Sequence, residues 1–118
     1  MLRVVLDTNI IVSALISKGK PRELLNSGVE NRFSIVTSDY ILKEIHSVLS
    51  RPQFKTSEEE TNMIVLALMQ SSEVVIVESK FKVIKNDPDD DMILSTAHDG
   101  RADIIATGDK NLLGLRGF

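Results

Sequence analysis

Short apolar runs alternate with helix-spaced apolar positions along the 118-residue chain. Val4–Leu6 is a continuous apolar run, as expected for a strand that is covered on both faces. After this run, apolar residues recur at intervals of three and four, which predicts a helix. The alternation predicts an α/β fold in which a central parallel sheet lies between two layers of helices, and a single domain over residues 1–118.

Four apolar runs predict the strands of this sheet, and a weaker run predicts a short extended piece. The strands are expected at Val4–Leu6, Phe33–Thr37, Val74–Val77 and Asp103–Ala106, and the extended piece at Lys82–Ile84. A doubly wound sheet usually has one more strand after the last of these. No further apolar run precedes Phe118, so we expect the final C-terminal strand to be missing.

Local signals predict the ends of the helices: proline in a first turn, glycine at an end, and Ser, Thr or Asp before a first turn. A capping box at residues 56–60 places acids where the helix dipole favours them. The first helix is expected after Asp7, the second from Pro21 to Gly28, and the third from Ser38 or Asp39 to about Leu49, before Arg51 and Pro52. Further helices are expected from residues 56–60 to about Gln70 and from Asp87-Pro88 onward, with a last turn at Asn111.

Composition excludes several kinds of site. The chain has no cysteine, which excludes disulfides, thiolate metal sites and cysteine nucleophiles. With two histidines, an imidazole-rich zinc site is not expected either. No apolar stretch approaches the roughly 18 residues that a membrane span needs, and the first run is too short for a signal peptide. We therefore expect a cytoplasmic protein with no membrane segment.

The formal net charge of −3 argues weakly against nucleic-acid binding, which usually goes with a basic surplus. A site built from carboxylates is itself acidic, however, and needs a metal ion to meet a phosphate. The basic residues also gather in two groups, Lys18, Lys20 and Arg22, and Lys80, Lys82 and Lys85. Two interpretations stay open for them: solvated surface, or residues that steer a phosphate.

Acidic residues follow the predicted strands, at the edge where open α/β sheets bind ligands. Asp7 follows the first strand directly, and Asp109 follows the fourth strand after two residues. Asp91 lies in the first turn of the helix expected after residue 88. Glu44 is mid-helix, where the periodicity places it at the border of the apolar arc. Four acids on separate elements could thus converge at one end of the sheet.

Each of these acids also has an ordinary interpretation. Asp7 can be a helix cap, Glu44 a surface acid and Asp109 a turn residue. Helix capping and the helix dipole account for a second group, Asp87, Asp89 and Asp90, to which we assign no chemistry. The combination of the four other acids, rather than any one of them, indicates a site.

Three stretches of the chain resemble the PIN-domain family of metal-dependent ribonucleases. Residues 4–9 end in its D-x-N signature, residues 41–49 resemble the helix with its glutamate, and residues 87–109 resemble the block with its last two aspartates. The match runs in order from Leu2 to about Leu113. Any one piece is a weak signal, but all of them in order are specific.

The resemblance implies that Asp7, Glu44, Asp91 and Asp109 are the catalytic residues and hold the metal. It also implies that Asn9 and Thr107 orient those carboxylates. Asp90 competes with Asp91, which we prefer because its spacing to Thr107 and Asp109 fits the family better. Carboxylate oxygens are hard ligands, so the expected cofactor is Mg²⁺ or Mn²⁺, and neither His46 nor His98 is required.

The wording D-P-D-D-D and T-G-D-K-N-L-L is similar to the VapC-like subgroup, which is assigned to the toxins of toxin–antitoxin pairs. This similarity implies an endoribonuclease with RNA as its substrate, an antitoxin protein as a partner, and a homodimer. Lys18, Lys20 and Arg22 are then candidates for binding the substrate.

Two rival interpretations remain. A PIN-like scaffold could bind RNA or a partner without nuclease activity. A phospho-acceptor signalling domain is also a short α/β protein with an aspartate cluster. It would need paired acids after its first strand, whereas here Asp7 leads straight into Thr8 and Asn9.

Overall fold

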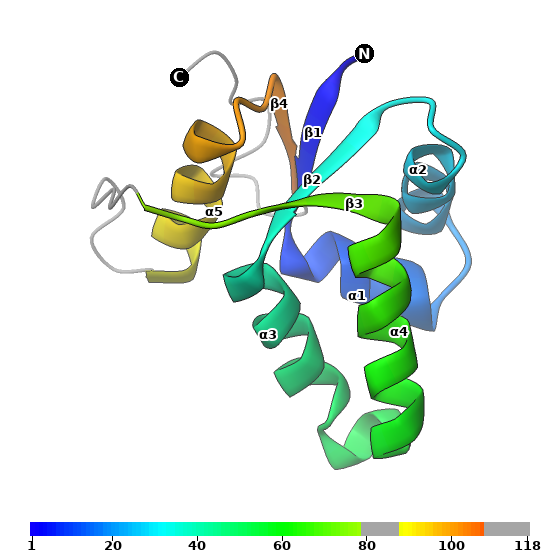
Figure 1. The fold of residues 1–118 in the computed structure, drawn as a ribbon. Helices are drawn as coiled ribbons and strands as arrows, with labels where there is room; N and C mark the ends of the chain where they lie inside the picture. The colour runs from blue at the N-terminus through cyan, green and yellow to red at the C-terminus, as the bar shows by residue number, and fades with distance from the viewer. Residues whose placement is uncertain (79–87, 108–118) are drawn as a thin grey trace.

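Four strands form one all-parallel sheet in the computed structural model, which describes residues 1–78 and 88–107, with the backbone alone at 88–90. The strands are β1 (Arg3–Leu6), β2 (Ser34–Ser38), β3 (Ser72–Val75) and β4 (Ile104–Ala106), in the order β3-β2-β1-β4. Central strand β1 pairs Val4 with Ile35 of β2 and with Ile104 of β4. Because all strands are parallel, their carboxyl ends lie at one edge of the sheet (Figure 1).

Helices cover both faces of this sheet, which confirms the predicted three-layer α/β/α fold. Gly28 in α2 lies against the Ile35 side chain, whereas Gly100, just after α5, lies against Val36. Neighbouring residues of a strand point to opposite faces, so α2 and α5 cover opposite faces. The helices are α1 (Thr8–Ile16), α2 (Lys20–Val29), α3 (Asp39–Leu49), the short 3₁₀ helix η1 (Pro52–Phe54), α4 (Glu58–Ser71) and α5 (Pro88–Asp99).

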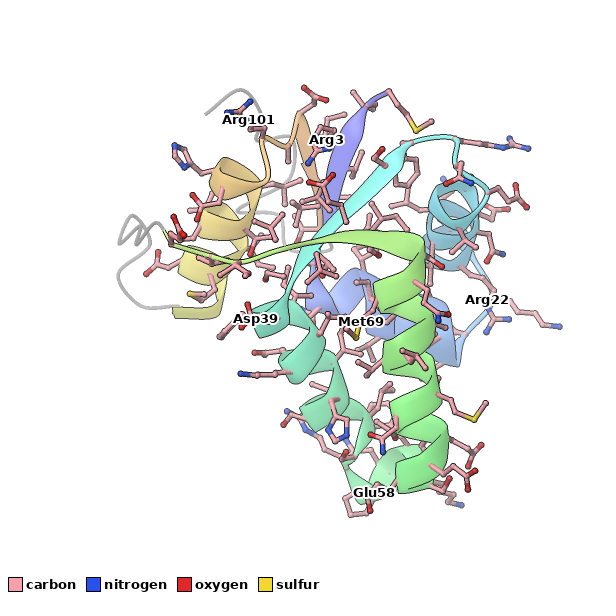
Figure 2. All side chains as sticks on the ribbon, viewed as in Figure 1. Arg3, Arg22, Asp39, Glu58, Met69 and Arg101 are labelled. Atoms are coloured by element: carbon pink, nitrogen blue, oxygen red, sulfur yellow. The ribbon has the colours of Figure 1, made fainter. Side chains whose placement is uncertain are left out.

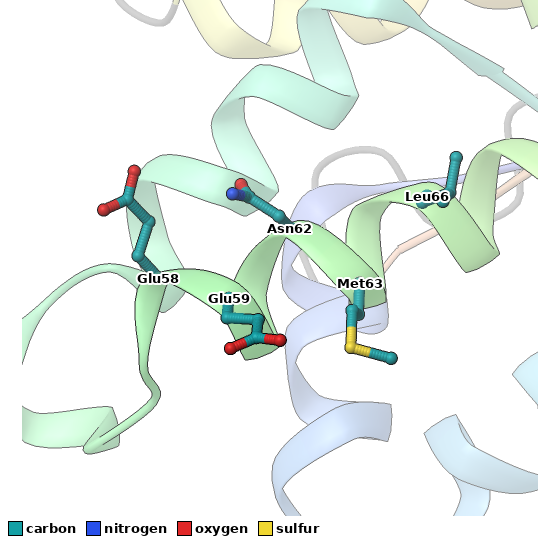
Figure 3. A pocket seen from close by; sticks show the side chains of 5 residues that line it. All are labelled: Glu58, Glu59, Asn62, Met63 and Leu66. Atoms are coloured by element: carbon teal, nitrogen blue, oxygen red, sulfur yellow. The ribbon is translucent and has the colours of Figure 1, made fainter.

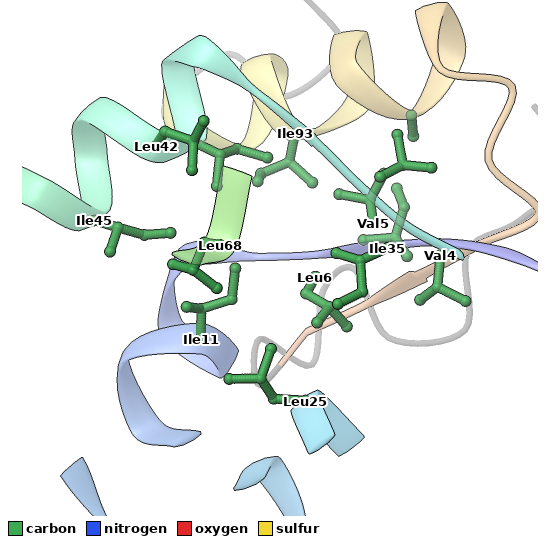
Figure 4. Packing of buried hydrophobic residues seen from close by; sticks show 14 of the residues in the cluster. Val4, Val5, Leu6, Ile11, Leu25, Ile35, Leu42, Ile45, Leu68 and Ile93 are labelled. Atoms are coloured by element: carbon green, nitrogen blue, oxygen red, sulfur yellow. The ribbon is translucent and has the colours of Figure 1, made fainter. Parts of the chain in front are cut away.

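The core fills the space on each face of the sheet. Figure 4 shows Leu6 with Ile11 and Leu25 on one side of β1, and Val5 with Ile93 of α5 on the other. Val5 and Leu6 are both 0% exposed, which explains why the run at residues 4–6 has no polar alternation. Each fully buried side chain of this size contributes about 1.5–3 kcal/mol to folding.

The predicted bounds of β3 are wrong. The strand spans Ser72–Val75 rather than Val74–Val77. Its partner β2 ends at Ser38, which pairs with Val75, and the chain then turns into α3. Ile76 therefore has no strand beside it to pair with, and its side chain is 78% exposed. Strand β2 also lies one residue later than predicted, and β4 starts one residue later.

Helix caps agree with the sequence signals in most places. Ser38, rather than Asp39, caps α3 by accepting the Ile41 backbone N–H at 3.3 Å. The capping box of α4 is present between Ser57 and Glu60. Gly28 is the exception, because α2 continues to Val29. That glycine serves packing, since a Cβ there would lie 2.5 Å from Ile35 Cγ1.

Other sequence expectations lie outside the described residues. These are the extended piece at Lys82–Ile84, the turn at Asn111 and the question of a C-terminal strand. Among residues 1–78 and 88–107, none of the helices combines the length and apolar character that crossing a membrane requires.

Candidate active site at the carboxyl edge of the sheet

The Asp7 carboxylate is fixed at the carboxyl edge of the sheet. Asp7 follows β1 and is 6% exposed. Its Oδ1 accepts the backbone N–H of Ile10 at 2.8 Å, which caps α1, and its Oδ2 accepts the Thr107 hydroxyl. Thr107 follows β4 and is itself buried. Both carboxylate oxygens are therefore held, one by the helix that starts here and one by the neighbouring strand.

Glu44 lies on the side of α3 that is turned away from α4. Its side chain is half-buried, at the border of the buried face made by Ile41, Ile45 and Leu49. The α4 side of the helix is marked by His46, whose Nε2 is 3.0 Å from Asn62 Oδ1. Two residues along a helix correspond to a rotation of about 200°, so Glu44 points the opposite way. Helices α1 and α5 also pack against α3.

Asp91 lies in the first turn of α5, and its side chain is half-buried. The last turn of α5 leads into the start of β4, so the first turn lies at the carboxyl edge of the sheet, the same end as Asp7. The side chains of Asp89 and Asp90 are outside the described residues, as are Asp87 and Asp109. The choice between Asp90 and Asp91 thus stays open, and the place of Asp109 stays a prediction.

The three described acids do not by themselves make a metal-binding cluster. Within the described part of the chain, no three His, Asp or Glu side chains lie close enough together to hold one ion. The kinds of donor present nevertheless fit Mg²⁺ or Mn²⁺, because both ions prefer carboxylate oxygens. Asp7 offers such a group with its orientation already fixed. Asp7, Glu44 and Asp91 do not lie close enough together in this structure to share one ion, and their convergence with Asp109 remains a prediction.

Arg22 has a structural task that its sequence position did not suggest. Its guanidinium donates to the carbonyl oxygens of Ala14 at 2.9 Å and Leu15 at 3.3 Å, in the last turn of α1. These carbonyls have no partner within their own helix, so Arg22 caps the end of α1. Lys18 and Lys20 are exposed beside it, and Figure 2 shows Arg22 in this region. Their role in substrate binding stays a prediction.

The remaining polar candidates lie at the surface. Asn9 is exposed in the first turn of α1, and its side chain makes no hydrogen bond to the described residues. His98 is exposed, with its Nδ1 3.1 Å from Asp99 Oδ1 near the end of α5. That end of α5 leads into β4 and is opposite to the edge with Asp7.

Sequence reasoning did not single out Thr96, which is wholly buried in α5. Its Oγ1 lies 2.9 Å from Ser38 Oγ at the end of β2. A signal was present, because Thr96 lies three residues after Ile93 and therefore on the buried face of the helix. Threonine is common on both buried and exposed faces, so this spacing alone did not indicate a partner.

An open hollow of about 530 Å³ lies on the outer face of α4, away from the sheet edge. Its lining residues are Glu58, Glu59, Asn62, Met63 and Leu66 (Figure 3). All of them come from one helix, and none is a candidate site residue. The hollow is thus a feature of the helix surface and is separate from the candidate active site.

Comparison with known proteins agrees with this geometry. A family model described as the PIN domain matches residues 3–111. An uncharacterized protein of Methanocaldococcus jannaschii is 35% identical over 119 residues, which cover 98% of this chain and 76% of that protein. Nuclease activity is proposed for the PIN-domain family, and its members typically bind Mg²⁺ or Mn²⁺. The family model covers nearly the whole chain, and the all-parallel sheet carries a fixed aspartate at its carboxyl edge. The chain therefore belongs to the PIN-domain family.

Proposed function

We propose that this protein is a metal-dependent endoribonuclease whose site is formed by Asp7, Glu44, Asp91 and Asp109. The observation that carries the proposal is the Asp7 carboxylate, which is 6% exposed and held at both oxygens at the ligand-binding edge of a PIN-family sheet. Carboxylate oxygens are the donors that Mg²⁺ and Mn²⁺ prefer, and a buried carboxyl group held in one orientation at this edge is suited to bind such an ion.

The protein's own contribution to catalysis is to hold oxygen donors in position. The Ile10 N–H and the Thr107 hydroxyl orient Asp7, and α3 presents Glu44 on the side away from α4. When bound, Mg²⁺ or Mn²⁺ supplies the activation of a water molecule and the stabilisation of the leaving oxygen. Close carboxylates repel one another, so a cation also favours their convergence.

RNA is the proposed substrate, in single-stranded or looped form where its bases and backbone are accessible. The exposed Lys18 and Lys20 are proposed to contact its phosphates. The salt dependence of RNA affinity in a variant with alanine at both positions tests this, because losing two phosphate contacts reduces the slope.

The proposal extends to a biological role as the toxin of a toxin–antitoxin pair, acting as a homodimer in the cytoplasm. Its support is the similarity of residues 87–91 and 107–113 to that subgroup. Helix α4 also exposes three apolar side chains, those of Met63, Leu66 and Met69. Exposed apolar surface of this type is often covered by a protein partner. Sedimentation of the isolated chain tests the dimer, and co-purification with the product of a neighbouring gene tests the antitoxin.

Calorimetric titration of Mn²⁺ into the wild type and Glu44→Gln, with RNA cleavage assayed on the same samples, tests the nuclease. We expect the wild type to bind Mn²⁺ and cut RNA, and the variant to lose both, because it replaces a carboxylate by an amide of the same shape. Glu78→Gln makes the same change at an exposed glutamate that is not a candidate site residue, and it is the matched control. Metal binding without cleavage in the wild type would favour the non-catalytic scaffold.

A further inference from the structure

The end of β2 and the buried face of α5 are joined by a hydrogen bond between two hydroxyl groups. Ser38 Oγ and Thr96 Oγ1 are 2.9 Å apart, and both residues are 0% exposed. Ser38 is the last residue of β2 and also the N-cap of α3, where its Oγ accepts the Ile41 N–H. The contact therefore links two helices that carry candidate site acids.

The hydroxyl groups of Ser38 and Thr96 can both donate a hydrogen bond. The Thr96 hydroxyl has one proton, and the Met92 carbonyl oxygen lies 2.8 Å from its oxygen. When Thr96 donates to Met92, the Ser38 hydroxyl can donate to Thr96, while Ser38 still accepts from Ile41. The result is a continuous chain from the Ile41 N–H to the Met92 carbonyl. Buried networks of this kind, with every donor satisfied, hold their members in one arrangement.

Two other buried hydroxyl groups show that burial alone does not produce such a chain. Thr37 Oγ1 and Thr61 Oγ1 are both buried and have no hydrogen-bond partner within the described residues. Thr61 lies in α4, which packs on the side of α3 away from Glu44 and contains none of the candidate site acids. The pairing of Ser38 with Thr96 is thus a specific feature of the junction between α3 and α5.

This chain of hydrogen bonds ends next to a site acid on α5 and begins in the helix that holds another. Met92 is adjacent to Asp91 in the first turns of α5. Ser38 and Ile41 form the first turn of α3, and Glu44 is one turn further along the same rigid helix. The hydrogen bond between Ser38 and Thr96 therefore constrains how α3, with Glu44, is placed relative to α5, with Asp91.

We propose that Ser38 and Thr96 are positioning residues, whose hydrogen bond sets the separation of Glu44 and Asp91 for binding a divalent cation. The proposal rests on the nuclease function proposed above. Groups that hydrogen-bond directly to metal ligands change metal affinity by roughly 10–100-fold when they are removed, and a contact that acts through the helices, as this one does, is expected at the lower end of that range. Neither hydroxyl touches the cation or the RNA in this scheme, since both are fully buried.

Thr96→Val tests the proposal, because valine keeps the shape of threonine and removes its hydroxyl. We expect Mn²⁺ affinity, measured by calorimetry, to fall by roughly tenfold, at the lower end of that range. Thr96→Ser keeps the hydroxyl and is expected to retain the wild-type affinity. Thr61→Val makes the same chemical change at a buried hydroxyl without a described partner, and is expected to leave Mn²⁺ affinity unchanged.

Ser38→Ala removes the same hydrogen bond together with the cap of α3, and it provides a second test if Thr96→Val does not fold. Where both single variants fold, the double variant with Ser38→Ala and Thr96→Val should bind Mn²⁺ no more weakly than Ser38→Ala alone, because the hydrogen bond between the two residues is already lost. Variants that lose thermal stability but keep wild-type Mn²⁺ affinity would show a purely structural contact and overturn the positioning role, with the nuclease proposal intact. A wild type that neither binds Mn²⁺ nor cuts RNA would overturn both proposals.

Discussion

Asp7 acts as a helix cap and is also the central acid of the candidate site, and the two roles can be separated by substitution. Asparagine caps helices as well as aspartate does, and its amide oxygen can accept the same Ile10 N–H. Asp7→Asn is therefore expected to keep the fold and to abolish RNA cleavage, because it replaces the carboxylate by an uncharged amide that can still cap α1 and can donate to the Thr107 hydroxyl. Thermal unfolding and cleavage measured on the same sample check both parts.

The control for that substitution is Asp7→Ala, which loses the cap as well. It should lower the free energy of unfolding by about 1 kcal/mol and also abolish cleavage. Wild-type cleavage by Asp7→Asn, in a preparation free of contaminating nuclease, would mean that Asp7 is a cap and nothing more.

Single residues of the site were predictable to different degrees. Asp7 is visible in the sequence because it ends an uninterrupted apolar run. Thr107 was expected to orient a carboxylate, and the structure shows its hydroxyl on Asp7. Thr96 was not found, because its partner Ser38 is 58 residues away along the chain and only the fold brings them together.

At the scale of elements, α2 packs onto β2 through a glycine that has no room for a side chain. Helix propensity alone would make Gly28→Ala stabilising by about 1 kcal/mol. A Cβ at this position would, however, lie 2.5 Å from Ile35 Cγ1 and 3.0 Å from Phe33 Cε1. We expect the substitution to lower the free energy of unfolding by about 1–2 kcal/mol, measured by urea titration, since overpacking exceeds the propensity gain.

The matched control is Asn26→Ala, at an exposed position of the same helix, which is expected to leave stability unchanged or to raise it slightly. The sign of the Gly28→Ala effect on stability shows whether overpacking or the gain in helix propensity is larger. A gain in stability would show that Ile35 moves aside at little cost.

Periodicity predicted the described α-helices and strands but not the short 3₁₀ helix η1. It also could not predict where a strand ends. Residues 74–77 are uniformly apolar, so the pattern placed β3 there. Its actual bounds follow from β2, whose last residue is Ser38, the partner of Val75. The length of one strand thus depends on where its neighbour turns into a helix, which is not a property of its own residues.

At the scale of the whole molecule, topology explains why the acids belong to one end, but it does not give their separations. Parallel strands bring the carboxyl ends together, so Asp7 and Thr107 meet although 100 residues separate them. Arg22 shows the limit of charge patterns. It falls beside two lysines in sequence, yet its guanidinium is bonded to α1 carbonyls. Its partner lies in another helix, so its neighbours in sequence did not indicate its role.

The opposite edge of the sheet is held by Arg3, which connects β1, β3 and the end of α5. Its Nη1 lies 3.0 Å from Glu73 Oε1, its Nη2 lies 2.6 Å from Glu73 Oε2, and its Nε lies 2.9 Å from the Gly100 carbonyl oxygen. The hydrogen bond from Arg3 lowers the pKa of Glu73 below its ordinary value of 4.5. Figure 2 shows Arg3 at this edge, beside β1.

This lowered pKa makes stability depend on pH in a defined direction. The folded state binds the Glu73 proton less readily than the unfolded chain, so the ion pair stabilises the fold above about pH 4.5. That contribution is lost as the pH falls through the lower pKa of the folded state. The Glu73 side chain is 55% exposed, and solvent screening limits the contribution to less than about 1 kcal/mol.

Glu73→Gln is therefore expected to lower the free energy of unfolding at pH 7 and to have a progressively smaller effect as the pH falls below about 4.5. Urea titrations of both proteins at a series of pH values measure this difference. It should also shrink at high salt, because the pair is partly exposed. Glu78→Gln, at an exposed glutamate that lies outside the helices and has no ion pair with the described residues, is the control. A difference that stays constant from pH 7 to pH 3 would mean that Glu73 stabilises the sheet edge through hydrogen-bond geometry that glutamine cannot reproduce, and not through its charge.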